Sequence, residues 1–329
     1  MLPEKMRTIE IREHGTPDVL ESGERSLPEF NDEQILVKTT ASGVNGPDII
    51  QRKGFYPPPP DATDLLGLEV SGEVVAIGKD VKRWSVGDRI CALTHGGAYA
   101  EYVPINENHC LPIPQGVSEQ DAAGIPETFF TVWNNFFLDR EIKEGSLFLV
   151  HGGAGGIGTT AIQLGVALGL NVYTTVSSAE NVAFCESLGA ARAINYREED
   201  FVEVIRDAGG ADLILDIVGG EYVSRNIKAT KPDARIVQLA FNQGSKVEVD
   251  LMPVMLKRLT ITGSTLRSRT PQFKARVAAD LEEKVWPLFA NGKLKTLTHS
   301  VFPFEQVIDT HEMMEAKQHR GKILLTPGG

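Results

Sequence analysis

The chain has 329 residues, more than one ordinary hydrophobic core holds, so two domains are expected. Hydrophobic residues make up 42% of it and charged residues 23%, a balance typical of soluble globular proteins. The net charge of −11 argues against a nucleic acid or an anionic membrane as partner, because binding phosphate groups needs a basic face. No apolar run is long enough to span a bilayer, and residues 1–12 lack the apolar centre of a secretion signal.

The three cysteines, Cys91, Cys110 and Cys185, are widely spaced and odd in number. They predict no disulfide framework, so we expect a protein of the reducing cytoplasm.

The first third of the chain is predicted to form short β-strands separated by turns. Residues 35–40, 69–77, 86–92 and 99–103 have the composition of strands. The prolines at 57–60 exclude a helix or a central strand there, because each of them lacks an amide donor. No helix of any length is expected before Ser118.

After Ser118 the pattern changes to alternating helices and strands. One helix is predicted from Gln120 to about Leu138, and another is predicted where Ile157, Ala161, Leu164 and Leu168 recur at helical spacing. Further helices are predicted from Ala179 to Leu188, with Gly189 as C-terminal cap, and over residues 271–291. The predicted strands are Leu147–His151, Val172–Val176, Ala193–Asn195, Leu213–Val218, Arg235–Leu239 and Leu259–Gly263, with a further β-like run at Gly321–Thr326. Six strands alternating with helices predict an α/β fold with a doubly wound parallel sheet, typical of dinucleotide-binding domains.

A glycine-rich turn follows the first of these strands. Gly153, Gly155 and Gly158 fit the pattern G-x-G-x-x-G between an apolar strand and an amphipathic helix. We expect Gly153 to permit a tight turn, Gly155 to let the backbone approach a pyrophosphate, and Gly158 to let helix and strand pack closely. Free N–H groups at the helix N-terminus would bind the anion. The alternative is a purely structural turn, which the flanking strand and helix disfavour.

The end of the second strand, Thr175–Ser178, bears on the choice of dinucleotide. An NAD enzyme often places a carboxylate there, and these four positions hold none. Small hydroxyl residues leave room for a 2′-phosphate, which favours NADPH. Glu180 and Asn181 follow where a phosphate site would favour Lys or Arg, so NADH stays an alternative.

Eight motifs resemble those of the medium-chain dehydrogenase/reductase superfamily, specifically its zinc-free quinone oxidoreductase branch. They are Asn45–Asp48, Gly54–Pro58, Leu66–Gly72, Val86–Ile90, His151–Gly158, Asp216–Gly220, Gly263–Arg269 and Gly321–Ile323. The resemblance implies a GroES-like β-barrel domain, residues 1–121 and 267–329, and a Rossmann domain, residues 122–266, with the active site in the cleft between them. It also implies a homodimer in which the strand Leu259–Gly263 pairs with its copy, since an edge strand needs a partner or a cover.

The resemblance further implies a set of site residues. Asn45, Asp48 and Tyr56 are expected around the catalytic centre, with Asn45 bonding near the ribose or nicotinamide and Tyr56 meeting the substrate by stacking or proton donation. Asp48 has the alternative of capping a helix after Pro47, and Tyr56 that of packing beside the prolines. The expected cofactor-binding residues are Asn45, Thr131, Gly153, Ala154, Gly155, Gly156, Ile157, Gly158, Ser177, Ser178, Tyr196, Asp216, Val218, Leu239, Phe241, Ser264, Leu266 and Lys322. For Asp216 a structural role, with Gly219 and Gly220 making a turn, is an equal alternative.

No metal is expected. Alcohol dehydrogenases of the superfamily hold a catalytic zinc with a Cys, a His and a second Cys. At the first two of these positions the chain has Asn45 and Leu68, and neither replaces a thiolate or an imidazole. His109 and Cys110 are adjacent, and adjacent residues of an extended strand point to opposite faces, so the pair does not form a site.

Without a Lewis acid, the substrate must be easy to reduce, as quinones are, because their anionic products are delocalised. The predicted function is therefore NADPH-dependent hydride transfer to a quinone or a similar electron-poor carbonyl compound, mainly through proximity. Three alternatives stay open: an enone or enoyl reductase of the same fold, a non-catalytic dinucleotide-binding protein with a structural or sensing role, and a zinc alcohol dehydrogenase.

Overall fold

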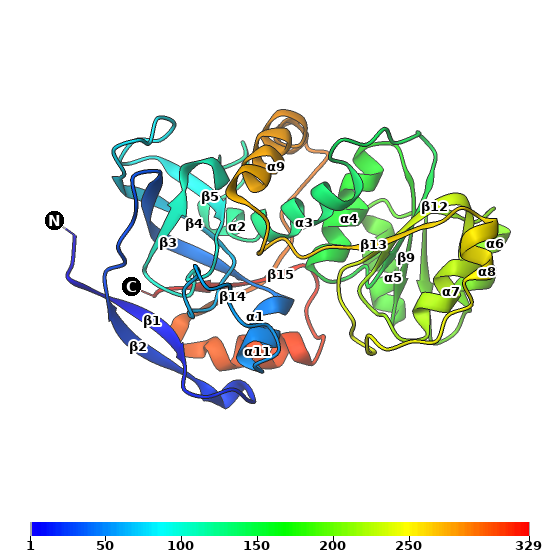
Figure 1. Cartoon of the computed structure of the whole chain (residues 1–329), viewed down its shortest axis with the longest axis horizontal. Coiled ribbons are helices and arrows are strands. Elements are labelled where there is room, and N and C mark those ends of the chain that lie inside the picture. The colour runs from blue at the N-terminus through cyan, green and yellow to red at the C-terminus, as the bar shows by residue number, and fades with distance from the viewer. Residues whose placement is uncertain (1, 329) are drawn as a thin grey trace. The chain divides into compact units, whose positions relative to one another are not determined.

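The computed structural model describes residues 2–328, which divide into two compact units (Figure 1). Unit 1 consists of Met1–Phe130 and Arg267–Gly329, and unit 2 of Thr131–Leu266. Both ends of the chain therefore belong to unit 1, and the middle of the chain forms unit 2.

Unit 2 is built on a six-stranded sheet that is parallel throughout, in the order β10-β9-β8-β11-β12-β13. The strands are β8 (Leu147–His151), β9 (Asn171–Val176), β10 (Arg192–Asn195), β11 (Ala211–Asp216), β12 (Thr230–Gln238) and β13 (Thr260–Gly263). This is the strand order of the doubly wound dinucleotide fold, so the predicted fold class is confirmed. The largest differences from the predicted strand ends are in β12, which begins at Thr230 rather than Arg235, and in β11, which runs from Ala211 to Asp216 rather than from Leu213 to Val218.

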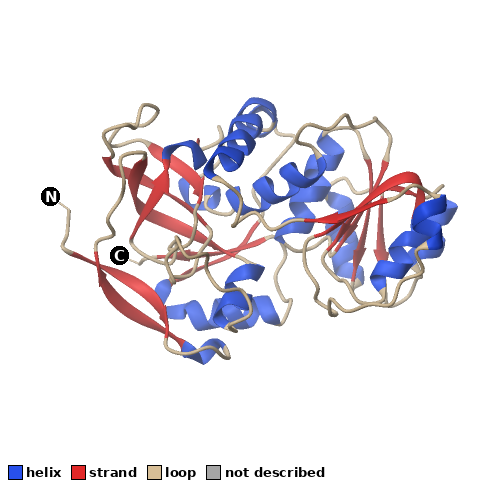
Figure 2. Cartoon of the chain, viewed as in Figure 1, coloured by secondary structure: helices blue, strands red, loops and turns tan. Residues whose placement is uncertain are grey.

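Helices cover both faces of this sheet (Figure 2). They are α4 (Gly156–Ala167), α5 (Ala179–Ser187), α6 (Phe201–Asp207), α7 (Tyr222–Ala229) and the short α8 (Met252–Leu256). Helix α5 ends as predicted, because Gly189 follows it with φ 99°, a backbone angle that glycine adopts without strain. The central strand β8 is buried between the helix layers, which explains its apolar sequence, whereas the edge strand β13 is largely exposed.

Unit 1 contains a sheet in the order β14-β15-β3-β4-β5-β7, with β6 paired to β3. Its strands are β3 (Gln34–Val44), β4 (Glu69–Ile77), β5 (Arg89–Leu93), β6 (Tyr102–Asn106), β7 (Cys110–Pro112), β14 (Thr298–Pro303) and β15 (Lys322–Thr326). The C-terminal strand β15 pairs antiparallel with the N-terminal β3, so the two ends of the chain close one sheet. The predicted strand at the C-terminal end is confirmed.

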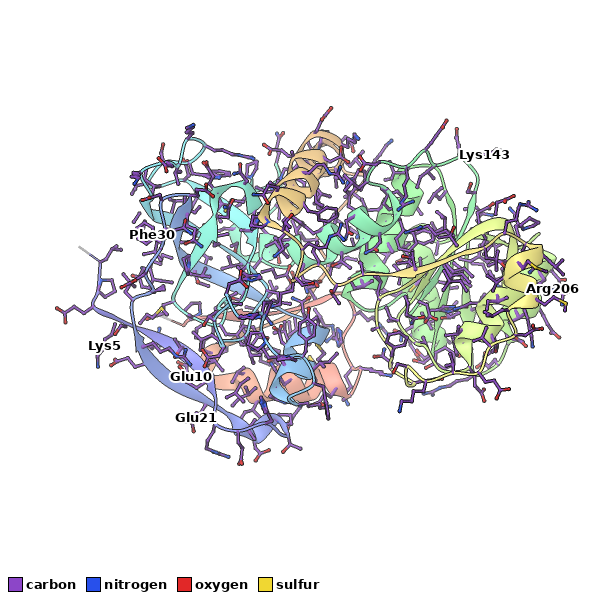
Figure 3. The ribbon with its side chains drawn as sticks, viewed as in Figure 1. Lys5, Glu10, Glu21, Phe30, Lys143 and Arg206 are labelled. Atoms are coloured by element: carbon purple, nitrogen blue, oxygen red, sulfur yellow. The ribbon has the colours of Figure 1, made fainter. Side chains whose placement is uncertain are left out.

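A separate hairpin begins the chain. Strands β1 (Lys5–Ile11) and β2 (Leu20–Ser26) pair antiparallel, and Glu10 lies opposite Glu21. Figure 3 shows Lys5, Glu10 and Glu21 along this hairpin, whose outer surface is rich in charged side chains.

Several helix predictions are wrong, and proline accounts for most of them. The helices of unit 1 are α1 (Gly46–Arg52), α2 (Glu119–Ala122), α9 (Pro271–Lys284), α10 (Trp286–Ala290) and α11 (Val307–Glu315), while α3 (Pro126–Phe136) runs from unit 1 into unit 2; short 3₁₀ turns lie at Pro17–Val19, Glu107–His109 and Phe304–Gln306. The predicted helix Gln120–Leu138 is split before Pro126, and the predicted helix 271–291 is split before Pro287. A proline has no amide to donate, so it starts a new helix in its first turn rather than continuing the old one.

The same rule explains α1, which was not expected. Pro47 occupies the first turn of this helix, where a missing N–H costs nothing. No helix within residues 2–328 is long and apolar enough to cross a membrane.

Phe148 provides a test of the unit 2 core. Its ring is fully buried on β8, with its centroid 4.8 Å from that of Phe136. We expect Phe148→Ala to lower the free energy of unfolding by about 3–5 kcal/mol, because it leaves a cavity in a close-packed interior. The matched control is Phe55→Ala, at a side chain that is 81% exposed, which should change stability by less than about 0.5 kcal/mol. Equal effects of the two variants in urea denaturation would contradict this packing.

Candidate functional site

The glycine-rich turn lies at the carboxyl end of β8, where ligands bind in open α/β sheets. Gly155 is the N-terminal cap of α4, in extended backbone with φ −79° and ψ 175°. The first amides of α4 therefore point out of the turn without intrahelical partners, which is the arrangement that binds a phosphate group.

One of the three glycines of the motif, Gly153, has a different role from the expected one. The left-handed backbone lies at Gly152, with φ 77°, and not at Gly153. Gly153 is needed for packing instead, since a Cβ there would lie 2.1 Å from Thr174 Oγ1 on β9. A Cβ on Gly158 would lie 2.2 Å from the Gly152 carbonyl oxygen, which agrees with the expected close packing. A Cβ on Gly155 would meet nothing nearer than 3.9 Å, so the space in front of this residue is open.

The other predicted cofactor-binding residues of unit 2 lie largely where its strands end. Tyr196 follows β10, and its amide donates to the carbonyl oxygen of Val176 at 3.0 Å, next to the predicted Ser177 and Ser178. The hydroxyl of Ser178 accepts from the amide of Asn181 as the N-cap of α5. The remaining members follow β11, β12 and β13 or lie on α3: Val218, Leu239, Phe241, Ser264, Leu266 and Thr131.

Asp216 belongs to a buried polar chain beneath the turn. Its carboxylate accepts from the amides of Val218 at 2.6 Å and Gly219 at 3.0 Å, and from Asn226 Nδ2 at 2.9 Å. Asn226 Oδ1 in turn accepts from His151 Nε2 at 2.7 Å. Burial lowers the pKa of His151, so the ring is neutral and its Nδ1 accepts from the Thr175 hydroxyl at 2.9 Å. These bonds support the structural alternative for Asp216, with positive φ at Gly219 and Gly220.

Thr131 and Ser264 share one neighbour. Asn135 donates from Nδ2 to the carbonyl oxygen of Thr131 at 2.8 Å and accepts from the Ser264 hydroxyl at 2.9 Å. The amide of Asn135 therefore fixes both predicted residues relative to each other within unit 2.

In unit 1 the structure brings Asn45, Asp48 and Lys322 together around a residue that was not predicted, Glu69. Lys322 Nζ lies 2.7 Å from Glu69 Oε1 and donates to Asn45 Oδ1 at 2.5 Å. Asn45 Nδ2 donates to the same Glu69 oxygen at 2.8 Å. The other carboxylate oxygen, Oε2, accepts from the amide of Glu127 at 2.9 Å. The side-chain oxygen and nitrogen of Asn45 thus both form hydrogen bonds with side chains of unit 1.

Asp48 lies in the first turn of α1 and accepts three hydrogen bonds. Its donors are the amides of Asn45 at 2.8 Å and Gly67 at 3.1 Å and the hydroxyl of Tyr99 at 3.3 Å. Burial raises its pKa to about 6 despite these donors. The alternative role of Asp48 in capping agrees with this geometry. Asn45 is the N-cap of α1, and Asp48, the third residue of the helix, accepts from the Asn45 amide in a capping box.

Tyr56 is not bonded to this cluster. It is half-buried, and the guanidinium carbon of Arg267 lies 5.8 Å from the centroid of its ring. Arg267 itself is buried and donates to Gln51 Oε1 at 2.6 Å. In the sequence Arg267 stands out only as part of the motif Gly263–Arg269, because nothing in its spacing shows that a buried arginine faces Tyr56.

Two of the three positions that bind the catalytic zinc in alcohol dehydrogenases, Asn45 and Leu68, hold no suitable donor. The side chain of Asn45 forms hydrogen bonds with Glu69 and Lys322, and the side chain of Leu68 has no lone pair that could bind a metal ion. His109 Nε2 contacts the carbonyl oxygen of Pro271 at 3.1 Å. In the part of the chain that the structure describes, no three side chains of His, Cys, Asp or Glu form a group that fits a metal ion.

The fold and the glycine turn define a dinucleotide-binding oxidoreductase with an added β domain. Residues 31–115 match the alcohol dehydrogenase GroES-like domain, and residues 156–283 match the zinc-binding dehydrogenase family. Quinone oxidoreductase 1 of Escherichia coli is 30% identical over 326 residues, which cover 97% of this chain and 99% of that protein. The chain belongs to the quinone oxidoreductases of the medium-chain dehydrogenase/reductase superfamily, as its motifs predicted.

Two solved structures extend the comparison. The crystal structure of Escherichia coli quinone oxidoreductase complexed with NADPH matches with a TM-score of 0.88 at 28% identity, over 98% of this chain and 100% of that one. The CurK enoyl reductase matches with a TM-score of 0.85 at 25% identity, over 98% and 99%.

The glycine turn provides a matched pair of variants. Gly158→Ala should lower the melting temperature by several degrees, because its new methyl group collides with backbone that cannot rotate away. Gly155→Ala has open space and ordinary backbone angles, so it should melt close to the wild type. Thermal unfolding followed by circular dichroism measures both, and equal melting of the two variants would contradict the assigned roles.

Asp48 should give unfolding a pH dependence. Its pKa is about 6 in the folded protein and about 4 in an unfolded chain, so the folded form keeps its proton longer and stability falls as pH rises between these values. The free energy of unfolding of the wild type minus that of Asp48→Asn should therefore decrease from pH 4 to pH 6, by up to about 3 kcal/mol. The exposed Asp309→Asn is the matched control for removing a carboxylate. A difference that rises with pH in urea titrations would contradict the raised pKa.

Proposed function

We propose that the protein is an NADPH-dependent quinone oxidoreductase that works without zinc. The observation that carries the proposal is the glycine turn at the carboxyl edge of a doubly wound sheet, in a chain that belongs to the quinone oxidoreductases. When bound, NADPH supplies the hydride from its reduced nicotinamide.

The amides at the start of α4 would bind the pyrophosphate of NADPH, with Gly155 leaving room for its approach. Residues 175–178 hold no carboxylate that would repel a 2′-phosphate, and Ser177 and Tyr196 lie beside this strand end. The Escherichia coli relative of known structure binds NADPH, which supports the same preference here. The predicted cofactor contacts of Asn45, Thr131 and Lys322 belong to this proposal.

Zinc independence rests on the donor set of unit 1. A tetrahedral zinc needs thiolates, imidazoles or carboxylates, and here an amide bonded to Lys322 and a leucine stand at two of the three positions. The acceptor must therefore stabilise its own negative charge, as a quinone does and a simple ketone does not. Tyr56 is the proposed substrate-side residue, since its hydroxyl has no hydrogen-bond partner within residues 2–328.

An acceptor screen tests the function directly. With NADPH in excess, the wild type should reduce 1,4-benzoquinone at a kcat/KM at least about tenfold higher than that for an enone such as cyclohexenone or for an enoyl thioester. NADH should support the reaction with a higher KM. Faster reduction of the enoyl thioester would instead favour the enoyl reductase function of a structural relative. Oxidation of one NADPH per chain without turnover would identify a non-catalytic dinucleotide-binding protein.

Tyr56→Phe tests the substrate-side residue. It should lower kcat/KM for the quinone by about tenfold or more and leave the Kd of NADPH unchanged, because it removes only the proposed proton donor. Tyr102→Phe, at another partly buried tyrosine of unit 1, is the matched control. Unchanged efficiency with several quinones would remove Tyr56 from the site.

We also propose that the protein forms a homodimer through β13. This strand ends the sheet of unit 2, and Ile261 on it is 43% exposed. The neighbouring α8 buries none of its residues and exposes Met252, Met255 and Leu256. An unpaired strand edge next to exposed apolar side chains favours pairing with β13 of a second copy of the chain.

Ile261→Lys should therefore convert a dimer into a monomer in light scattering after size exclusion, because a charge blocks edge pairing. Ile77→Lys, at a residue of unit 1 that is 41% exposed, should stay dimeric. A wild type that is monomeric at all concentrations would contradict the proposed interface.

The protein is further proposed to be cytoplasmic, which agrees with three buried cysteines that form no disulfide.

A further inference from the structure

Arg267 is a buried cation without a counter-ion. Its side chain is 5% exposed, and no carboxylate within the described residues forms an ion pair with it. Its hydrogen-bond partners are neutral: Gln51 Oε1 at 2.6 Å and the carbonyl oxygen of His95 at 3.2 Å. The third nitrogen, Nη2, is buried and has no partner. A buried charge in this state is costly, so its retention points to a use for the charge.

The surroundings hold the guanidinium in one place. Gln51 is fixed from its other end, because its Nε2 donates to the carbonyl oxygen of Asp64 at 2.8 Å. Gly96, with φ 131°, leaves the space for Nη2, since a Cβ there would lie 2.8 Å from it. Lys274 Nζ donates to the carbonyl oxygen of Arg267 at 2.8 Å. Burial lowers the pKa of this lysine to about 8.

Among residues 2–328 the guanidinium faces one aromatic ring, that of Tyr56, and its carbon lies 5.8 Å from the centroid of the ring. Cation and ring attract each other at this distance, which restricts the orientation of the ring. Burial raises the pKa of Tyr56, and so do the carboxylates of Glu127 and Asp48, whereas the charge of Arg267 opposes the rise. Arg267 is thus the positive group that acts on this phenol, and two negative groups act against it.

We infer that Arg267 is a positioning residue for Tyr56, holding the phenol in place and stabilising the phenolate that forms when Tyr56 gives up its proton. The inference rests on the proposed function. Hydride transfer places two electrons on the quinone and leaves an anionic oxygen. The O–H bond of Tyr56 then breaks as a new O–H bond forms on that oxygen, and the electron pair stays on Tyr56. A proton from water restores the phenol, and the products are hydroquinone and oxidised nicotinamide.

The test compares Arg267→Gln, Arg267→Lys and Arg269→Gln in the reduction of 1,4-benzoquinone by NADPH across a range of pH. Arg267→Gln should lower kcat about tenfold or more, leave the Kd of NADPH unchanged, and move the basic limb of the kcat profile to higher pH. Arg267→Lys keeps the charge and should restore part of kcat and the position of the limb. The exposed Arg269, whose guanidinium lies over Phe273, is the matched control and should behave as wild type.

A uniform loss of kcat with an unmoved limb, equal in the Gln and Lys variants, would overturn the inference and leave the proposed function standing. Absence of quinone turnover in the wild type would instead overturn the proposed function. The inference is then decided by a pH titration of the phenolate absorbance at 295 nm. Subtracting the absorbance of the double variant Arg267→Gln, Tyr56→Phe from that of Arg267→Gln leaves the signal of Tyr56 alone. A Tyr56 titration at higher pH than in the wild type supports it, and an unchanged titration refutes it.

Discussion

The buried ion pair between Lys322 and Glu69 is the contact on which unit 1 depends. Its charges lie 2.7 Å apart, with the side chain of Glu69 fully buried and that of Lys322 9% exposed. Each charge would be costly to bury alone. Here the Asn45 side chain forms hydrogen bonds with both charged groups, and the backbone amide of Glu127 donates to the second carboxylate oxygen of Glu69. Losing one partner of such a pair costs about 3–5 kcal/mol, because the other charge is left unpaired. The pair therefore fixes the C-terminal strand β15 against the strands from the beginning of the chain.

The same pair determines what chemistry unit 1 can support. The amino group of Lys322 is the positive charge beside Asn45, and its hydrogen bond helps to hold the Asn45 amide in one orientation. Arg267 is another of the buried cations in the unit, and it faces Tyr56 rather than a carboxylate. In the proposed zinc-free function the acceptor must delocalise its own negative charge, which suits a quinone better than an unactivated ketone.

The sequence allowed the fold of unit 2 to be predicted because its strands are short runs rich in apolar and β-branched residues, separated by helices and glycines, and each predicted run became a strand. The breaks of helices at Pro126 and Pro287 were predictable from proline chemistry but lay inside periodic apolar segments, which favoured one long helix. The glycine turn was found from its spacing, yet the roles of Gly152 and Gly153 depend on Thr174 of the next strand. Glu69 and Arg267 were missed as site residues because their partners, Lys322 and Tyr56, are more than two hundred residues away in the chain.

The most direct test of the account is the metal content of the active protein. We expect the purified chain, measured by inductively coupled plasma mass spectrometry, to contain far less than one zinc ion per chain. Quinone reduction with NADPH should be unchanged after dialysis against a chelator. One tightly bound zinc per chain, with activity lost on chelation and restored by zinc, would contradict the account.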